Sequence, residues 1–205
     1  MLEGSTLTAI RTGAASGAAT DLLARPESRV VAIFGAGAQG RTQLEAVSNV
    51  REIETVWIVD TDTARAQNFI DEMSGRAPIP ADIRIAPDPK TALAHADIIC
   101  TATTSVKPVY DAADVRPGTH INGVGSYTLD MIENPPEMLL NASIFIDEKN
   151  AILAEAGEIM SAIRELGLAE DGMTELGDLV LGKASDRQSK EEITFFKSVG
   201  VAVQD

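Results

Sequence analysis

A glycine-rich turn is the segment of this sequence with the clearest chemical meaning. It reads Gly35-Ala-Gly-Ala-Gln-Gly40, with the spacing Gly-x-Gly-x-x-Gly, and it directly follows the apolar run Val30-Val-Ala-Ile-Phe34. In such a turn Gly35 permits a tight bend, Gly37 lets the backbone approach a pyrophosphate, and Gly40 lets a helix pack on the strand. A helix that begins here offers free N–H groups and a partial positive charge to phosphates. We therefore predict that this turn binds a dinucleotide.

An acidic residue supports this prediction. Asp60 follows a second apolar run, Thr55-Val-Trp-Ile-Val59, and lies 20 residues after Gly40. A carboxylate there accepts hydrogen bonds from the adenosine ribose and repels a 2′-phosphate, which favours NAD(H) over NADP(H). Arg65, one turn into the next predicted helix, could instead accommodate that phosphate. Two alternatives stay open: a glycine turn that only reverses the chain, and an S-adenosylmethionine-dependent methyltransferase, which shares the loop and the acid.

The elements that must position these residues alternate along the chain. Short apolar runs are predicted as strands buried on both faces of a parallel sheet, with helices between them. The predicted strands cover 30–34, 55–59, 83–85, 98–102, 120–123 and 143–146, and the predicted helices cover 39–48, 63–73 and 89–95. This alternation predicts an α/β fold, a Rossmann-type doubly wound parallel sheet. We assign residues 29–150 to this dinucleotide-binding domain.

The segment 1–28 is predicted to form one helix that ends near Ala24, because Pro26 disfavours helix at the residue before it. Most of its residues are Ala, Gly, Ser and Thr. Gly13 and Gly17 weaken the helix by about 1 kcal/mol each, so tertiary packing must hold it. Small side chains allow another backbone to approach closely, and Arg11 is a large cation within this small, neutral face.

The segment 151–205 is predicted to be helical and to pack on the dinucleotide-binding domain. The expected helices span 150–165, 174–182 and 189–203, and a Ser189-x-x-Glu192 capping box opens the last one. Residues 130–205 carry a net charge of −10, against −4 for residues 1–129. We interpret this excess as a solvated helical surface.

Composition excludes several classes of protein. The net charge of −14 and the pI near 4.5 argue against nucleic-acid binding, which needs clustered Lys and Arg. No run of about 18 apolar residues is present, so no membrane span is expected. The first residues show no signal-peptide pattern. The single cysteine, Cys100, forbids an intramolecular disulfide and fits a reducing compartment, so a cytoplasmic location is expected.

Five segments together resemble the ornithine cyclodeaminase/mu-crystallin family, and they lie in family order along the whole chain. They are LTAIRTGAAS at 7–16, FGAGAQGRTQLEAV at 34–47, ADIICTATTS at 96–105, HINGVGSYTLDM at 120–131 and EEITFFKSVGVAVQD at 191–205. The family includes NAD-dependent cyclodeaminases, alanine dehydrogenases and NAD(P)H-dependent ketimine reductases. The resemblance therefore implies hydride transfer between nicotinamide and the α-carbon of an amino acid or cyclic imine.

The resemblance also implies roles for individual residues. Arg11 would reach both the cofactor and the substrate carboxylate, which a guanidinium fork matches bidentately. Implied cofactor contacts are Ala38 and Gln39 at the pyrophosphate, Asp60 at the ribose, Thr101 after the fourth strand, Gly123, Val124, Gly125 and Ser126 beside the nicotinamide, and Ser198 near the ring, with Val199 facing the substrate. The structural alternatives are an ion pair for Arg11 and local hydrogen bonds for Thr101 and Ser198.

Two departures from the family pattern narrow the reaction. Ser126 stands where cyclodeaminases have a catalytic aspartate, and Asp130 stands where they have a lysine. A serine hydroxyl without a partner does not replace a carboxylate as a general base. Ser126 resembles the ketimine reductase and mu-crystallin branch, so we predict an NAD(H)-dependent reductase or dehydrogenase. Ornithine cyclodeaminase and a nucleotide-binding protein without turnover are the alternatives.

A further departure concerns length. In the family a further portion precedes the segment at Leu7, and it carries a second arginine, a lysine and much of a dimer interface. The helix in 1–28 is then a remnant of the substrate and dimerisation half. The resemblance implies a homodimer for the full-length form.

The remaining candidate residues have simpler interpretations. His95 and His120 are general-base candidates by type, but core or surface roles are favoured by their places in a short helix and a strand. Cys100 is predicted to be a buried small hydrophobe. Glu155 and Glu158 are interpreted as a solvated helix start. No cluster of metal-ligand spacing is present, so no metal is predicted.

Overall fold

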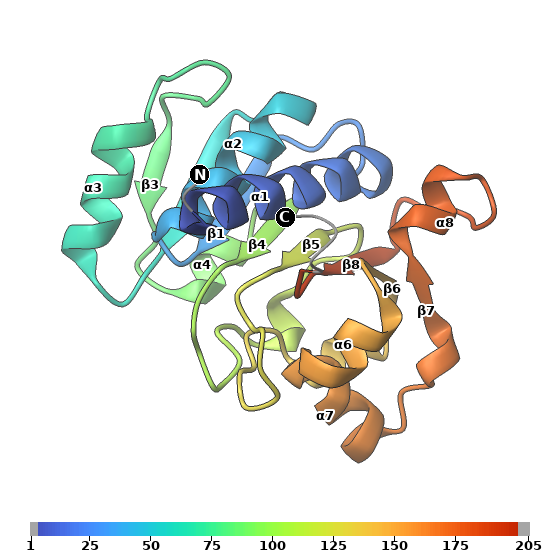
Figure 1. Cartoon of the computed structure of the whole chain (residues 1–205). Helices are drawn as coiled ribbons and strands as arrows, with labels where there is room; N and C mark the ends of the chain where they lie inside the picture. Colours follow the sequence, from blue (N-terminus) through green and yellow to red (C-terminus); the bar gives the residue numbers. More distant parts are fainter. Residues whose placement is uncertain (1–3, 201–205) are drawn as a thin grey trace.

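The centre of the molecule is one parallel sheet of eight strands in the order β3-β2-β1-β4-β5-β8-β6-β7 (Figure 1). The computed structural model describes residues 4–200. The strands are β1 (Val30–Phe34), β2 (Thr55–Val59), β3 (Ile83–Ile85), β4 (Ile98–Thr101), β5 (His120–Gly123), β6 (Ala142–Ile146), β7 (Met173–Glu175) and β8 (Ile193–Lys197). All neighbouring strands pair in parallel, which confirms the predicted fold class.

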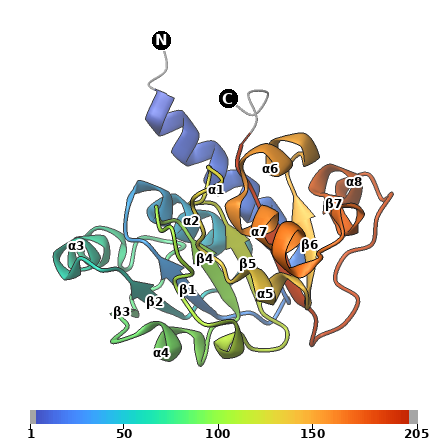
Figure 2. The same ribbon diagram turned by 90° about the horizontal axis from the view of Figure 1, so that it is seen from below.

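Helices cover both faces of this sheet (Figure 2). They are α1 (Gly4–Leu23), α2 (Ala38–Val50), α3 (Thr63–Met73), α4 (Pro89–Leu93), α5 (Pro136–Leu139), α6 (Lys149–Glu155), α7 (Gly157–Leu166) and α8 (Leu176–Val180), with short 3₁₀ turns η1 (Ala112–Asp114) and η2 (Glu170–Gly172). Among the described residues, no helix combines the length and the apolar character that crossing a membrane requires.

The apolar strand β1 shows why these strands read as unbroken hydrophobic runs. Successive side chains of a strand point to opposite faces. Val31 and Ile33 accordingly belong to one buried cluster, together with residues of α2 and α3. Ala32 and Phe34 belong to another, together with residues of α4, α5 and α7. Both faces are buried, so neither face of the strand needs polar residues.

The C-terminal segment differs from the prediction. Within the described residues, 189–200 contain strand β8 instead of a helix, and β8 lies between β5 and β6. The capping-box hydrogen bonds do form, from the Glu192 N–H to Ser189 Oγ (3.1 Å) and from the Ser189 N–H to Glu192 Oε2 (3.2 Å). They close a turn in front of the strand, whose Ile193-Thr-Phe-Phe sequence has high β-propensity. Residues 201–203 of the predicted helix lie outside the described residues.

Two other predicted helices are also divided. The expected helix over 150–165 is interrupted at Ala156, which separates α6 from α7. The expected helix over 174–182 begins as strand β7, and only Leu176–Val180 is helical. β7 pairs with β6 at the edge of the sheet, so sheet pairing competes successfully with helix formation there.

Helix α1 packs closely on α2 through its glycines, as the small-residue composition predicts. A Cβ atom on Gly13 would lie 2.8 Å from the carbonyl oxygen of Thr42, and one on Gly17 would lie 3.2 Å from the Cβ of Ala46. Gly13 and Gly17 are four residues apart on α1, and Thr42 and Ala46 are four residues apart on α2. Each of these pairs therefore lies on one face of its helix. The two backbones therefore meet where a side chain is missing.

Arg51, just after α2, fixes the end of α1. The last carbonyls of a helix have no intrahelical partner. The Arg51 guanidinium donates to the carbonyl oxygens of Thr20 (3.0 Å), Asp21 (2.9 Å) and Ala24 (2.9 Å). Its side chain is only 9% exposed. A cation at this end also interacts favourably with the helix dipole, so α1 is held at its middle by close packing and at its end by Arg51.

We predict that Gly13→Leu destabilises the protein by about 2 kcal/mol or more, because the new side chain overpacks the contact with Thr42. The matched control is Ala14→Leu, one residue along on the exposed side of α1, which should change the free energy of unfolding by less than about 0.5 kcal/mol. Urea unfolding of the three proteins measures both values. Equal stability of the two variants would contradict the close packing of α1 on α2.

Candidate functional site

The candidate site lies where the strand order of the sheet reverses. From β1 the chain first builds β2 and β3 on one side, and it then returns to place β4 on the other side. Open α/β sheets bind ligands in the crevice at such a point, outside the carboxyl ends of the strands. A cleft of about 350 Å³ is found there. Its lining includes six of the predicted site residues: Arg11, Gln39, Val124, Gly125, Ser198 and Val199.

The three glycines of the turn meet different surroundings. Gly35 has φ +97°, a left-handed conformation that favours glycine, and a Cβ there would lie 2.5 Å from the Ala102 carbonyl oxygen. A Cβ on Gly40 would overlap the carbonyl oxygen of Gly35, so this position admits no side chain. Gly37 has open space where its Cβ would be. Gly35 and Gly40 thus serve the bend and the close packing, while Gly37 faces room for a ligand.

The first turn of α2 leaves its N–H groups available. The residue before the helix, Gly37, provides no side-chain cap. Uncapped N–H groups and the positive end of the helix dipole form a site for an anion. The residues present here therefore fit a pyrophosphate, with Ala38, Gln39 and Gly40 supplying the first N–H groups.

Arg41 and Asp60 hold the turn in place from two sides. Arg41 donates to the carbonyl oxygens of Ala36 (2.5 Å) and Gly37 (3.1 Å), and its Nε donates to Glu72 (2.6 Å). The Asp60 carboxylate accepts from the Ala36 N–H (2.7 Å). The predicted ribose acid is therefore hydrogen-bonded to the turn itself, and it links the ends of β1 and β2. Arg41 is a supporting residue that the motif alone does not predict.

Arg65 lies against Asp60. Its Nη2 is 2.9 Å from Asp60 Oδ1, and its Nε is 3.2 Å from Oδ2. Burial favours a higher pKa for Asp60, but the N–H groups of Asp62 and Ala36 and the Arg65 guanidinium together hold the pKa below its ordinary value. Asp60 is thus a carboxylate at neutral pH. The Arg65 side chain is half exposed, whereas that of Asp60 is nearly buried.

A second carboxylate, Asp147, orders the chain after β8. Its Oδ2 accepts from the Ser198 hydroxyl (2.8 Å), the Val199 N–H (3.1 Å) and the Gly200 N–H (2.9 Å). The Arg11 guanidinium lies over Gly200, because a Cβ there would be 2.5 Å from Arg11 Nη1. Arg11 from the first helix and Ser198–Gly200 from the last turn therefore meet in one wall of the cleft. No sequence signal identified Asp147, which ends the sixth strand like many ordinary loop acids.

Ser126 joins a buried ionic cluster. Its hydroxyl donates to Glu158 Oε2 (2.5 Å) and accepts from Lys197 Nζ (2.5 Å), and Lys197 also donates to the Ser126 carbonyl oxygen (2.6 Å). Lys197 and Glu158 form an ion pair of 3.2 Å, and both side chains are fully buried. Ser126 is buried as well and does not line the cleft. Its predicted catalytic role stays a prediction.

Glu133 binds two loops of the cleft together. Its Oε1 accepts from the Thr103 N–H (2.5 Å), and its Oε2 accepts from the N–H groups of Gly125 (2.6 Å) and Ser126 (2.8 Å). Thr103 follows β4, and Gly125 and Ser126 follow β5. Burial raises the pKa of Glu133, and the charge of Lys197 acts in the opposite direction. The prediction that the acidic residues of 130–205 form a solvated surface is therefore wrong for Glu133. It is also wrong for Glu158, which the sequence places at a solvated helix start.

Thr101 and Asn134 extend the cluster toward β4. Asn134 Nδ2 donates to Thr101 Oγ1 (3.1 Å) and to Glu158 Oε1 (3.1 Å), and Asn134 Oδ1 accepts from the Tyr110 hydroxyl (2.8 Å). Thr101 and Gly123 are buried and do not line the cleft. Their predicted cofactor contacts stay predictions. A lysine directly after the apolar run at 193–196 is the one local signal that could have indicated this cluster.

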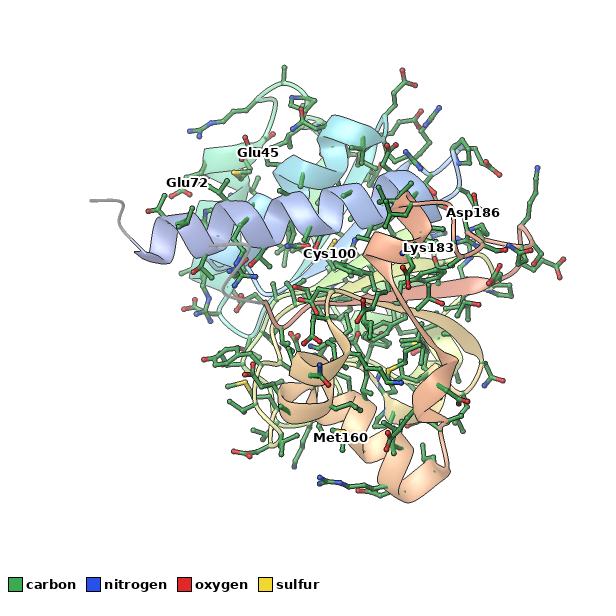
Figure 3. The ribbon with its side chains drawn as sticks, turned by 45° about the vertical axis from the view of Figure 1, so that its right-hand side comes forward. Glu45, Glu72, Cys100, Met160, Lys183 and Asp186 are labelled. Carbon is green, nitrogen blue, oxygen red and sulfur yellow. The ribbon has the colours of Figure 1, made fainter. Side chains whose placement is uncertain are left out.

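The other titratable candidates lie away from the cleft. His120 is buried in β5, where its ring is hydrogen-bonded to Thr194 Oγ1 (2.9 Å) and Asn122 Oδ1 (3.2 Å). His95 is exposed. These core and surface places agree with the sequence interpretation. Cys100 is buried in the interior among the strands (Figure 3), and burial raises the pKa of its thiol to about 12. In the described part of the chain, no three His, Cys, Asp or Glu side chains could share a metal ion.

Comparison with known proteins identifies the family. A family model described as "Ornithine cyclodeaminase/mu-crystallin family" matches residues 1–205. The chain belongs to this family. It is 40% identical over 207 residues to a Delta(1)-pyrroline-2-carboxylate reductase of Bacillus cereus, covering 100% of this chain and 63% of that protein. It is 33% identical over 206 residues to the ketimine reductase mu-crystallin of Macropus fuliginosus, covering 100% of this chain and 61% of the relative.

A solved structure supports the same assignment. The Delta(1)-pyrroline-2-carboxylate reductase of Thermococcus litoralis, in complex with NADH and L-proline, is 40% identical and superimposes with a TM-score of 0.94. The match covers 98% of this chain and 62% of that one. The chain thus spans slightly less than two thirds of the length of these relatives.

We predict that His120 makes stability depend on pH. Burial, together with the charge of Arg187, lowers the pKa of His120 to about 3, whereas an unfolded histidine has a pKa near 6.5. Between these values the unfolded chain binds a proton that the folded chain does not, so stability falls as the pH falls. The slope from this group is about 1.4 kcal/mol per pH unit. In urea unfolding at pH 7, 6 and 5, His120→Gln should have a shallower dependence than the wild type. Parallel curves would contradict the prediction.

Proposed function

We propose that the chain binds NAD(H) at the reversal point of the sheet. The observation that carries this proposal is the Gly35–Gly40 turn, which opens the uncapped helix α2 and is bound through the Ala36 N–H to Asp60. The pyrophosphate would accept from the first N–H groups of α2, and Asp60 would accept from the adenosine ribose. The adenosine half then lies over β1 to β3, and the nicotinamide half lies over β4 and β5.

We further propose that the enzyme reduces a cyclic imine of an amino acid, or runs the reverse oxidation. The bound dinucleotide supplies the hydride that adds to the α-carbon of the imine. Arg11 lines the cleft, and its guanidinium would bind the substrate carboxylate bidentately. The Thermococcus litoralis relative binds NADH together with L-proline, a cyclic amino acid with a carboxylate of this kind. Pyrroline-2-carboxylate is therefore the first substrate to test.

The remaining predicted residues have roles that follow from their positions. Val124, Gly125, Ser198 and Val199 would form the walls around the nicotinamide and the substrate. Ser126 would hold the loop after β5 through Glu158 and Lys197. A serine in the place of the cyclodeaminase aspartate would then leave hydride transfer to the bound cofactor. Assembly as a homodimer and a cytoplasmic location belong to the same proposal.

The second candidate function is binding without turnover. It is supported by the cleft, in whose described lining Arg11 is the single cation that could bind a substrate carboxylate. Ornithine cyclodeaminase is a third candidate, but Ser126 and Asp130 both disfavour it.

Calorimetry and absorbance distinguish these candidates. We expect NADH to bind this chain, and we expect nicotinamide absorbance to fall when pyrroline-2-carboxylate is added to the chain with NADH. Binding of NADH with no change in absorbance would support the second candidate function, nucleotide binding without turnover. The absence of any binding of NADH and NADPH would refute the proposal, and release of ammonia from ornithine would favour the cyclodeaminase.

We predict that Asp60→Asn shifts the preference toward NADP(H). The substitution removes the charge that repels a 2′-phosphate and releases Arg65 to bind it. The ratio of the NADPH to the NADH dissociation constant should fall at least tenfold in calorimetric titrations. The matched control is Asp62→Asn, because Asp62 caps α3 and asparagine caps equally well. An unchanged ratio in Asp60→Asn would argue against a ribose contact at this residue.

A further inference from the structure

The buried cluster of Glu133, Glu158 and Lys197 contains two acidic side chains and only one basic side chain. Of its acidic members, Glu158 is paired with Lys197, and Glu133 accepts from the backbone N–H groups of Thr103, Gly125 and Ser126. All three side chains are fully buried. A buried charge is costly unless it is hydrogen-bonded or paired. The presence of a second buried carboxylate at this place therefore needs an explanation.

The hydrogen bonds indicate that both acids are carboxylates. Backbone N–H groups donate to both oxygens of Glu133, so both oxygens act as acceptors. Glu158 accepts from Ser126 Oγ and Asn134 Nδ2, and it lies in the first turn of α7, where the helix dipole favours a negative charge. Lys197 donates to Ser126 and pairs with Glu158. Two carboxylates and one ammonium leave one net negative charge.

This negative charge lies directly behind a wall of the cleft. Glu133 is one hydrogen bond away from Thr103 and Gly125, and both of these residues line the cleft. The fit is tight, because a Cβ on Gly125 would overlap Glu133 Oε1 and the backbone of Thr103. Between the carboxylate and the cleft there is accordingly only one layer of backbone, with no room for solvent to screen the charge.

The wall concerned belongs to the half of the sheet formed by β4 and β5. A dinucleotide that binds across the reversal point places its adenosine half over one set of strands and its other half over the second set. If Asp60 binds the adenosine ribose, as proposed above, the nicotinamide half would face Thr103 and Gly125. The nicotinamide ring carries a positive charge when oxidised and none when reduced.

We propose that the cluster of Glu133, Glu158 and Lys197 favours the oxidised, cationic dinucleotide over the reduced one, through the net negative charge that it holds behind the cleft wall. This inference rests on the proposed binding of NAD(H). The same charge would stabilise the positive charge that develops on the ring as the reduced cofactor gives up its hydride. The cluster would then promote reduction of the imine without touching either reactant.

The ratio of the dissociation constants for NAD⁺ and NADH tests this role. Removal of a unit charge one layer of backbone away from a cationic ligand, at an effective dielectric constant of about 20, changes a binding constant about tenfold. We therefore expect Glu133→Gln to raise the ratio of the NAD⁺ constant to the NADH constant about tenfold. Calorimetric titrations of each protein with NAD⁺ and with NADH measure the two constants. Arg11 and Glu155, which line the cleft, and Asp147 behind Ser198 are unchanged in the variant.

A second variant and a surface control complete the experiment. Glu158→Gln should raise the same ratio. It is the test variant to use if Glu133→Gln does not unfold cooperatively in a thermal melt, which would show that Glu133→Gln is not folded. Glu137→Gln removes an acid of α5 from the same segment, outside the buried cluster, and should leave the ratio unchanged. If both nucleotides bind the folded variants more weakly by the same factor, the cluster only positions the loops and the inference is overturned. Failure of the wild type to bind either nucleotide would instead refute the proposed function.

Discussion

The position of strand β8 is the constraint on which the rest of the structure depends. β8 pairs with β5 on one side and with β6 on the other, and β7 reaches the sheet only through β6. The same strand carries Lys197 at its end, and the turn that follows it carries Ser198 and Val199 into the cleft. Without β8 the sheet would end at β5, and the buried acids beside the cleft would lack their cation.

The first part of the fold and the glycine turn follow from local sequence. Val30–Phe34 and Thr55–Val59 are central strands covered by helices, so their apolar runs identify them without any knowledge of their partners. The bend at Gly35 and the packing at Gly40 depend on the strand and helix that the motif itself joins. The place of Asp60 follows from the same βαβ unit. A single sequence contains all of this information.

The C-terminal part depends on partners that are distant in sequence. Ser189 and Glu192 form the hydrogen bonds of a capping box, yet β5 and β6 offer two edges to the next segment, and sheet pairing prevails. The sequence predicts that Glu133 and Glu158 are surface acids, because their N–H, hydroxyl and ammonium partners are distant in sequence. Lys197, the ion-pair partner of Glu158, follows it by 39 residues. Burial of a charge is a property of the assembled site, and local composition does not encode it.

The place of β8 also bears on the order in which the protein is made. β8 is synthesised after every other strand, yet it must enter between β5 and β6, and it pairs His120 with Thr194, 74 residues later. As the chain leaves the ribosome, β1 to β5 can pair in turn, whereas β6 and β7 must wait with their edges uncovered. Long-range pairing of this kind slows folding. The nascent chain therefore needs protection longest at the edges of β5 and β6 that β8 later joins.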